Sequence, residues 1–219
     1  MSMKFTEEKL EQAIIELLKV EGYVYVPGQE ISREPAEVLI KDDLKVYLKT
    51  RYAADHITSG EIDSVVRKLE VFLASDLYES NKAIMKMVSD GFLLKREDRN
   101  KKDLYIQLID YRDLTEHRTA KPTEVQTVVA EDTPSYDATY NIYKIVNQLE
   151  ITGYEKRIPD GILYINGLPL VVLEFKSAIR EEATIHDAYV QLTTRYRRDI
   201  PELFKYLSLI HISEPTRRA

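Results

Sequence analysis

Residues 159–176 of this chain are Pro159-Asp160-Gly-Ile-Leu-Tyr-Ile-Asn-Gly-Leu-Pro-Leu-Val-Val-Leu-Glu174-Phe-Lys176. The pair Asn166-Gly167 lies between two apolar runs, and such a pair is the strongest short-range signal for a β-hairpin. The second run, residues 170–176, is apolar on both faces of the expected strand, which is typical of a strand in the centre of a sheet. The stretch therefore predicts a hairpin whose second strand lies in the core of the fold.

Two charged residues end this second strand. Because side chains alternate between the faces of a strand, Glu174 and Lys176 share one face, and Leu173 and Phe175 share the other. Burying a carboxylate and an ammonium group at the end of a core strand costs free energy unless the groups pair or serve a function. These charges are therefore candidates for a functional site.

The position of Asp160 relative to Glu174 depends on the turn. A two-residue loop with regular pairing would place Asp160 opposite Leu173, so that the two carboxylates lie on opposite faces. A three-residue loop, or one bulge with Gly167 in the left-handed region, shifts the count by one residue. We predict this odd count, because only then do Asp160, Glu174 and Lys176 converge.

Convergence of these three side chains would suit metal-assisted hydrolysis of a phosphodiester bond. Two carboxylates can hold a hard divalent cation, which polarises a phosphoryl oxygen and lowers the pKa of a bound water. A lysine beside them can orient that water or stabilise the developing charge. The alternative is an edge hairpin with a surface ion pair, since the charged pattern is short.

The same residues resemble the PD-(D/E)xK nuclease motif, within a longer resemblance to the N-terminal nuclease region of type I restriction enzyme R subunits. The dense resemblance spans about residues 141–206 and is carried by residues 141–148, 158–160, 166–177 and 198–204. A looser resemblance covers residues 10–18 and the pair Gly22-Tyr23. The resemblance as a whole implies a restriction-endonuclease-like fold.

By this resemblance Asp160, Glu174 and Lys176 are catalytic, and Asp160 and Glu174 are the metal ligands. The family also carries a Gln-x-x-x-Tyr element after the catalytic lysine, which adds Gln191 to the catalytic residues. In this chain the tyrosine comes one position late, at Tyr196. The chain therefore departs from the family pattern at the tyrosine.

Further site residues are expected on two helices. The first helix of related nucleases often lends an acid to the metal site, so Glu11 is a candidate ligand by resemblance, and a solvated helix face is the alternative. Gln191, Arg195 and Arg198 recur at helical spacing and would share one stripe. Because arginine binds phosphate well, Arg195 and Arg198 are candidate DNA-binding residues together with Tyr196, and a plain surface stripe is the alternative.

The resemblance implies a Mg2+-dependent endonuclease domain, in which Mn2+ can replace Mg2+, that cuts double-stranded DNA without its own sequence specificity. Its partners would be the specificity and methyltransferase subunits. ATP would serve only the full-length subunit, because this chain has no Gly-x-x-x-x-Gly-Lys-Ser/Thr loop. Two alternatives stay open: a non-catalytic module that docks on those subunits, and a nuclease for branched or single-stranded DNA.

Composition is ordinary for a soluble globular chain, and 219 residues suffice for one sizeable domain. The net charge of −6 argues against a globally basic DNA-coating protein, although a nuclease needs only a local basic face. The absence of cysteine excludes disulfides and zinc–thiolate sites and fits a reducing cytosol. With no signal sequence or membrane-spanning run evident, we expect a cytoplasmic protein.

Hydrophobic periodicity predicts an α/β fold: a mixed sheet of five or six strands, flanked by helices, in one domain over residues 1–206. Residues 34–91 would form an inserted helical segment. Helices are expected over residues 5–21, 34–52, 61–74, 81–89 and 184–198, and strands over residues 23–26 and 104–111 and within 137–149. The charged residues 95–102 would be a solvated hairpin tip or a phosphate-contacting loop.

Two segments are expected outside the regular fold. Residues 115–135 hold two prolines and many polar residues, which predicts an exposed connection with a short strand at 125–129. Residues 207–219 do not resemble the continuation of the family, so we expect a truncated or foreign tail and leave it outside the fold.

Overall fold

A computed structural model describes residues 6–112, 140–176 and 185–213 of the chain. Its centre is a five-stranded mixed sheet in the order β1-β4-β7-β8-β9. The two outer pairs, β1 with β4 and β8 with β9, are parallel, whereas β7 is antiparallel to both of its neighbours. The strands are β1 (Val24–Pro27), β4 (Tyr143–Asn147), β7 (Gly161–Ile165), β8 (Leu168–Phe175) and β9 (Leu209–Ser213). The predicted mixed α/β fold is confirmed.

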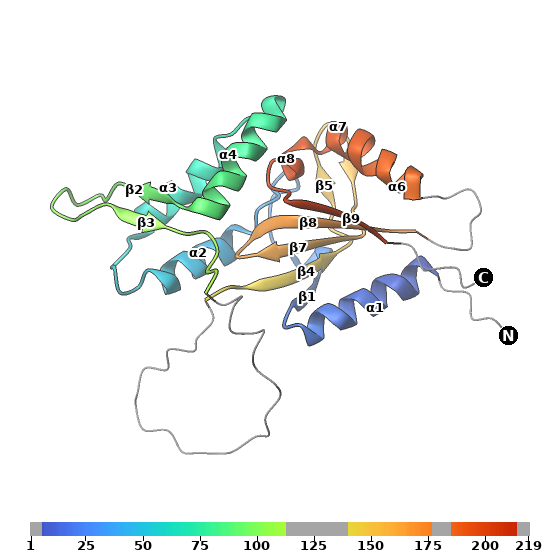
Figure 1. Ribbon diagram of the computed structural model, residues 1–219, viewed down its shortest axis with the longest axis horizontal. Coiled ribbons are helices and arrows are strands. Elements are labelled where there is room, and N and C mark those ends of the chain that lie inside the picture. The colour runs from blue at the N-terminus through green and yellow to red at the C-terminus, as the bar shows by residue number, and fades with distance from the viewer. Residues whose placement is uncertain (1–5, 113–139, 177–184, 214–219) are drawn as a thin grey trace, which may run out of the picture.

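Helix α1 (Glu7–Val20) covers one face of the sheet (Figure 1). The side chain of Thr6 caps it by accepting a hydrogen bond from the backbone of Lys9 at 3.3 Å. Two buried residues of the helix, Leu10 and Ile15, pack in one cluster with side chains of that face, Ile145, Leu173 and Phe175. The expected amphipathic helix is thus present, and its apolar stripe holds it beside the end of β8.

The inserted segment contributes α2 (Lys41–Arg51), α3 (Ser59–Glu70) and α4 (Leu77–Asp90). These helices and the sheet share one large buried cluster. The helix expected over residues 34–52 begins only at Lys41. Residues 34–40 instead form a connection whose carbonyls accept hydrogen bonds from Arg33, although Val38 and Leu39 are buried as predicted.

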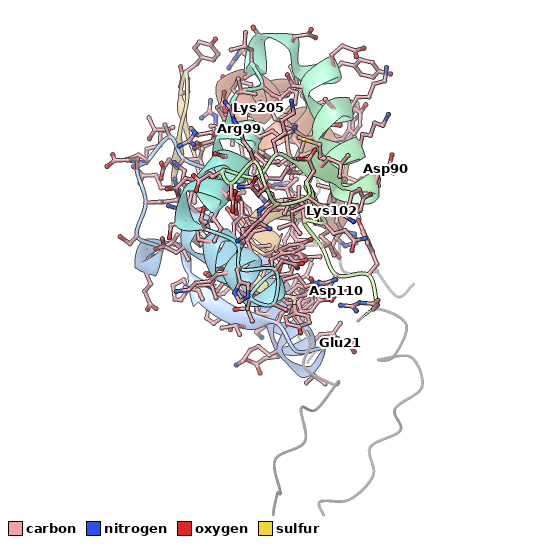
Figure 2. The ribbon with its side chains drawn as sticks, turned by 90° about the vertical axis from the view of Figure 1, so that its left-hand side faces the viewer. Glu21, Asp90, Arg99, Lys102, Asp110 and Lys205 are labelled. Carbon is pink, nitrogen blue, oxygen red and sulfur yellow. The ribbon has the colours of Figure 1, made fainter. Side chains whose placement is uncertain are left out.

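The charged turn at residues 95–102 joins β2 (Phe92–Leu94) to β3 (Leu104–Ile106) in a separate antiparallel pair. Only three residues of the expected strand 104–111 are extended. The turn lies at the end of the molecule opposite the C-terminal end of β8, and Figure 2 shows it from that side, with Arg99 and Lys102 labelled. Its Arg96 is not free, because its Nε lies 2.8 Å from the buried Glu61 carboxylate. The solvated hairpin tip is therefore favoured over a phosphate-contacting loop.

The β7–β8 hairpin has the odd residue count that we predicted, but the extra residue does not lie in the turn. Asn166 and Gly167 form a two-residue turn, with φ of 52° and 77°, and Ile165 pairs with Leu168. The register then shifts, so that Leu163 pairs with Val171 and Leu170 is the extra residue. Extending the shifted register beyond the last pair, Gly161 with Leu173, places Asp160 opposite Glu174 on one face.

A helical stretch follows over residues 185–199, as expected. It consists of α6 (Ile185–Val190), a π-helical segment η3 (Gln191–Tyr196) and α7 (Arg197–Asp199), and α8 (Pro201–Phe204) comes next. A small hairpin of β5 (Ile151–Thr152) and β6 (Lys156–Arg157) packs on the end of α7, where the backbone N–H of Tyr154 donates to the carbonyl of Asp199 at 2.7 Å.

Residues 209–213 correct our expectation of a tail outside the fold. They form β9, which pairs in parallel with β8 from Val171 to Phe175 and satisfies the backbone groups of that edge. Residues 214–219 lie outside the described part of the chain, as do the expected connection at 115–135 and its short strand. Among the described residues, no helix is long and apolar enough to cross a membrane.

Gly167 couples the hairpin to the inserted segment, because its carbonyl accepts a hydrogen bond from the backbone of Ile40 at 3.0 Å. A Cβ atom at position 167 would lie 2.1 Å from the carbonyl oxygen of Ile40, and the φ there is positive. We expect Gly167→Ala to lower the free energy of unfolding by about 3 kcal/mol or more.

Chemical denaturation would measure the free energy of unfolding of Gly167→Ala, with Gly22→Ala as the matched control. Gly22 also has a positive φ, of 91°, but no atom lies within 4 Å of the added Cβ. This substitution should cost only about 1 kcal/mol of left-handed strain. Equal losses of stability in the two variants would contradict the close contact at the turn.

Candidate active site

The carboxylate of Glu174 lies at the centre of a polar cluster at the C-terminal end of β8. Its Oε1 accepts hydrogen bonds from Lys176 Nζ and from Gln191 Nε2, both at 2.7 Å. Lys176 Nζ also lies 3.5 Å from Gln191 Oε1. Glu174 is only 2% exposed, so this charge is held away from solvent by the strand and by η3. Three of the predicted catalytic residues thus meet in one cluster.

Asp160 completes the pair of carboxylates at the start of β7. Its Oδ2 accepts a hydrogen bond from the backbone N–H of Phe175 at 2.7 Å, which fixes the carboxylate against the end of β8. The register shift at Leu170 is what brings Asp160 to this position, because regular pairing would have placed it opposite Leu173. The hairpin therefore brings the two predicted metal ligands to one end of the sheet.

The surroundings of Asp160 and Glu174 disfavour the charged form of both carboxylates. The pKa of Glu174 is raised to about 7, first by burial and then by the neighbouring charge of Asp160, whereas Lys176 and Gln191 lower it. Burial also raises the pKa of Asp160, and the charge of Glu11 contributes to this increase. Groups that resist ionisation in this way favour the approach of a cation.

A divalent cation fits this pair of carboxylates. Glu174 Oε2 is buried and accepts no hydrogen bond from any described residue, so one oxygen of the carboxylate lacks a partner. Hard cations prefer such carboxylate oxygens and complete their shell with water or substrate oxygens. Nowhere in the described ranges do three or more His, Cys, Asp or Glu residues group closely enough to hold a metal. Asp160 and Glu174, which the hairpin brings to one end of the sheet, are the residues that would hold the cation.

Glu11 approaches the site from α1 but is held by residues that we did not single out in the sequence. Its Oε1 accepts a hydrogen bond from Asn147 Nδ2 at 2.6 Å, and Asn147 Oδ1 accepts one from the hydroxyl of Tyr25 at 3.1 Å. Asn147 pairs with Gly161, the residue after Asp160. The sequence gives one signal for Asn147, which is its position as a polar residue at the end of an apolar strand.

The late tyrosine reaches the site because the helix is locally wider. In η3 the backbone N–H of Arg197 donates to the carbonyl of Leu192, five residues earlier, which is the π-helical pattern. Residues 191 and 196 consequently lie on one side, and Gln191 Nε2 donates to the hydroxyl of Tyr196 at 3.0 Å. That hydroxyl donates to the carbonyl of Ile158 at 3.2 Å, and burial raises its pKa to about 12, so it stays protonated. Tyr196 thus steadies Gln191.

Gln191, Arg195 and Arg198 lie on one side of the helix, as the expected stripe required, because all three line one hollow. Gln191 faces Glu174, but neither arginine contacts a carboxylate of the site. Arg198 Nε donates to Asp199 Oδ1 at 2.6 Å, and Arg195 is exposed. The side chain of Arg195 makes no hydrogen bond or ion pair with any described residue.

The raised pKa of Glu174 predicts a specific dependence of stability on pH in the metal-free chain. Between about pH 4.5 and pH 7 the folded chain keeps a proton on Glu174 that the unfolded chain has lost, so stability falls as the pH rises through this window. Because one pKa unit corresponds to about 1.4 kcal/mol, the loss due to this group should be about 2–3 kcal/mol.

Denaturant unfolding at pH 5 and pH 8, in the presence of a chelator, would measure this loss. We expect Glu174→Gln to lose less stability than the wild type over this range, whereas Glu16→Gln, an exposed residue of α1, should behave as the wild type. The same dependence on pH in Glu174→Gln as in the wild type would contradict the raised pKa.

Comparison with known proteins identifies the family to which this chain is similar. Residues 4–216 match the family model described as type I restriction enzyme R protein N terminus. The chain is 27% identical over 218 residues to the type I restriction enzyme HindI endonuclease subunit of Haemophilus influenzae. It is 25% identical over 212 residues to the type I restriction enzyme SsaAORF53P endonuclease subunit of Staphylococcus saprophyticus. Each alignment covers 95% of this chain and 18% of the relative.

The match covers almost the whole sequence, including the hairpin that carries Asp160 and Glu174 and the helix that carries Gln191. The chain therefore belongs to the family of type I restriction enzyme R protein N termini.

Proposed function

We propose that this chain is a metal-dependent endonuclease domain that hydrolyses DNA phosphodiester bonds, as the endonuclease part of a type I site-specific deoxyribonuclease. The observation that carries the proposal is the buried carboxylate of Glu174. One of its oxygens contacts Lys176 and Gln191, and the other has no partner among the described residues. Most buried polar atoms in proteins have a hydrogen-bond partner, so a buried carboxylate oxygen without one is a candidate ligand for a cation.

Asp160 and Glu174 would hold Mg2+, which Mn2+ can replace. The cation would supply a Lewis acid for the phosphoryl oxygen and would lower the pKa of a bound water. It would also offset the repulsion by which Asp160, after burial, raises the pKa of Glu174. Glu11, held by Asn147, stands close enough to influence the charge of Asp160 and is the candidate for an additional or water-mediated ligand.

Lys176 is the proposed catalytic cation. Its ammonium group lies 2.7 Å from Glu174 Oε1, so it is fixed beside the carboxylate pair and can orient a water or stabilise negative charge on phosphate. Gln191 holds the same carboxylate oxygen through its amide, and Tyr196 fixes that amide. Gln191 would steady the site, and Tyr196 would act on the site through Gln191.

The proposed substrate is double-stranded DNA, bound through its phosphates and without sequence specificity of the domain itself. Arg195 and Arg198 are the candidate phosphate contacts on the helix that carries Gln191. Sequence specificity would come from the specificity and methyltransferase subunits of a type I complex in the cytoplasm. ATP would be used by other parts of the full-length subunit, since no phosphate-binding loop of the ATPase type occurs in these 219 residues.

Metal binding tests the carboxylate pair directly. We expect titration calorimetry with MgCl2 or MnCl2 to show binding by the wild type and at least a tenfold weaker affinity in Asp160→Asn and Glu174→Gln, because each loses one anionic ligand. Glu16→Gln removes an exposed carboxylate of α1 and serves as the control. Absence of binding at millimolar metal, or binding that neither substitution changes, would exclude this site and favour a non-catalytic docking module.

Cleavage tests the role of Lys176 separately from metal binding. We expect Lys176→Gln to reduce the rate of nicking of plasmid DNA by about 10²–10³-fold, as for loss of one group that stabilises developing charge. Its affinity for Mn2+ should remain within a few-fold of the wild type. Lys86→Gln, which removes an exposed ammonium group on α4, should cleave normally. Comparison of linear duplex, branched and single-stranded substrates in the same assay would identify the preferred DNA form.

A further inference from the structure

A hollow of about 470 Å³ opens beside the carboxylate cluster, between the β5–β6 hairpin and the helix that contains η3. Two of the residues that line it, Gln191 and Tyr196, also belong to the candidate active site. The other polar lining residues are all cations: Lys156 and Arg157 from β6, and Arg195 and Arg198 from the helix. The lining residues come from two segments far apart in the sequence, β6 and the helix, and only the fold brings them together.

We propose that this hollow binds a backbone phosphate of the DNA strand that is cut, next to the bond that the site cleaves. The inference rests on the proposed nuclease function and assigns Lys156 and Arg157 to DNA binding together with Arg195 and Arg198. The occupant is an internal phosphodiester, because the hollow is open at the surface and is lined with charged groups, and its aromatic lining residue, Tyr196, is too buried for a base to stack on it.

Continuity with the cluster is the first argument. Gln191 lines the hollow, and its amide nitrogen also lies 2.7 Å from Glu174 Oε1. One side chain thus separates the hollow from the proposed metal ligands. A phosphate bound there would be a near neighbour, along the same strand, of a phosphate bound at Asp160 and Glu174.

Preorganisation of the cations is the second argument. Arg157 donates through Nε to Asp199 Oδ2 at 2.7 Å, and Arg198 contacts the other oxygen of this carboxylate. Asp199 is only 1% exposed and is therefore a buried anchor that fixes two guanidinium groups at the rim of the hollow. A guanidinium group held in place loses less entropy when it binds phosphate than a mobile one does.

Charge balance is the third argument. Besides Asp199, two carboxylates approach these cations: Glu150, 2.5 Å from Lys156 Nζ, and Glu155, 3.7 Å from Arg157. Both are largely exposed, and exposed pairs are weak enough for phosphate to compete with them. Arg195 makes no ion pair with any described residue. The hollow therefore offers cationic groups to an anion in a chain whose net charge is −6.

The opposite side of the site has the opposite charge. The first turn of α1 carries Glu7 and Glu8, and Glu11 follows on the same helix. Glu11 lies beside the cluster, because its carboxylate accepts a hydrogen bond from Asn147, which pairs in the sheet with Gly161, the residue after Asp160. A polyanion at the cluster is thus repelled from α1 and attracted towards the hollow, so the DNA strand would continue towards β6.

The test is binding of a fluorescein-labelled 20-base-pair duplex, followed by anisotropy at several salt concentrations in the presence of a chelator. We expect Arg195→Gln and Lys156→Gln each to weaken binding about fivefold at low salt and to reduce the slope of log K against log salt by about 0.9. Arg197→Gln is the matched control, because Arg197 is an exposed arginine of the same helix that lines a different hollow. It should bind as the wild type.

The proposal is overturned if Arg195→Gln and Lys156→Gln bind as Arg197→Gln does, or if the wild type does not bind the duplex at low salt. Tighter binding of a duplex with a 5′-phosphate would also overturn it, because the hollow would then hold a strand terminus. None of these outcomes depends on metal. Calorimetric binding of Mn2+ by the same variants would show separately whether the proposed function itself fails.

Discussion

The register shift at Leu170 is the constraint on which the site depends. One extra residue in β8 shifts its pairing with β7 by one position. Asp160 and Glu174 therefore lie on the same face at one end of the sheet. Without it, Asp160 would lie opposite Leu173, against the apolar cluster that holds α1. The tight turn at Asn166-Gly167 and its hydrogen bond to Ile40 fix the other end of the same hairpin, so the register has little freedom to slip.

Convergence of the carboxylates has an electrostatic cost, and the neighbouring elements reduce it only in part. Lys176 and Gln191 contact one oxygen of Glu174, and the other oxygen stays buried without a partner. The pKa of Glu174 remains raised despite the adjacent ammonium group. Free energy released by burial of the apolar sheet and helices supports this strained pair, as is common where a fold must hold charges for a cation. A binding site is thus maintained by the stability of the core around it.

Sequence patterns were sufficient for the hairpin, the first helix and the helix after β8, because each has a strong local signal. They also predicted that Asp160, Glu174 and Lys176 would lie together, and the family resemblance added Gln191. They failed at residues 34–40, where apolar residues at helical spacing are buried in a connection. The strand β9 was missed because its residues do not resemble the family's continuation and were left outside the fold, although they pair with β8. Asn147, Lys156 and Arg157 could not be assigned, because their neighbours at the site come from residues far away in the chain.

The π-helical segment has a consequence for how this family can vary. An extra residue inside a regular α-helix rotates every following side chain by about 100° about the helix axis. Here the i to i+5 bonds of η3 confine the extra residue to one turn, so Tyr196 still meets Gln191. Wherever a relative gains or loses one residue in this turn, geometry can be conserved while the interval between the motif residues is not.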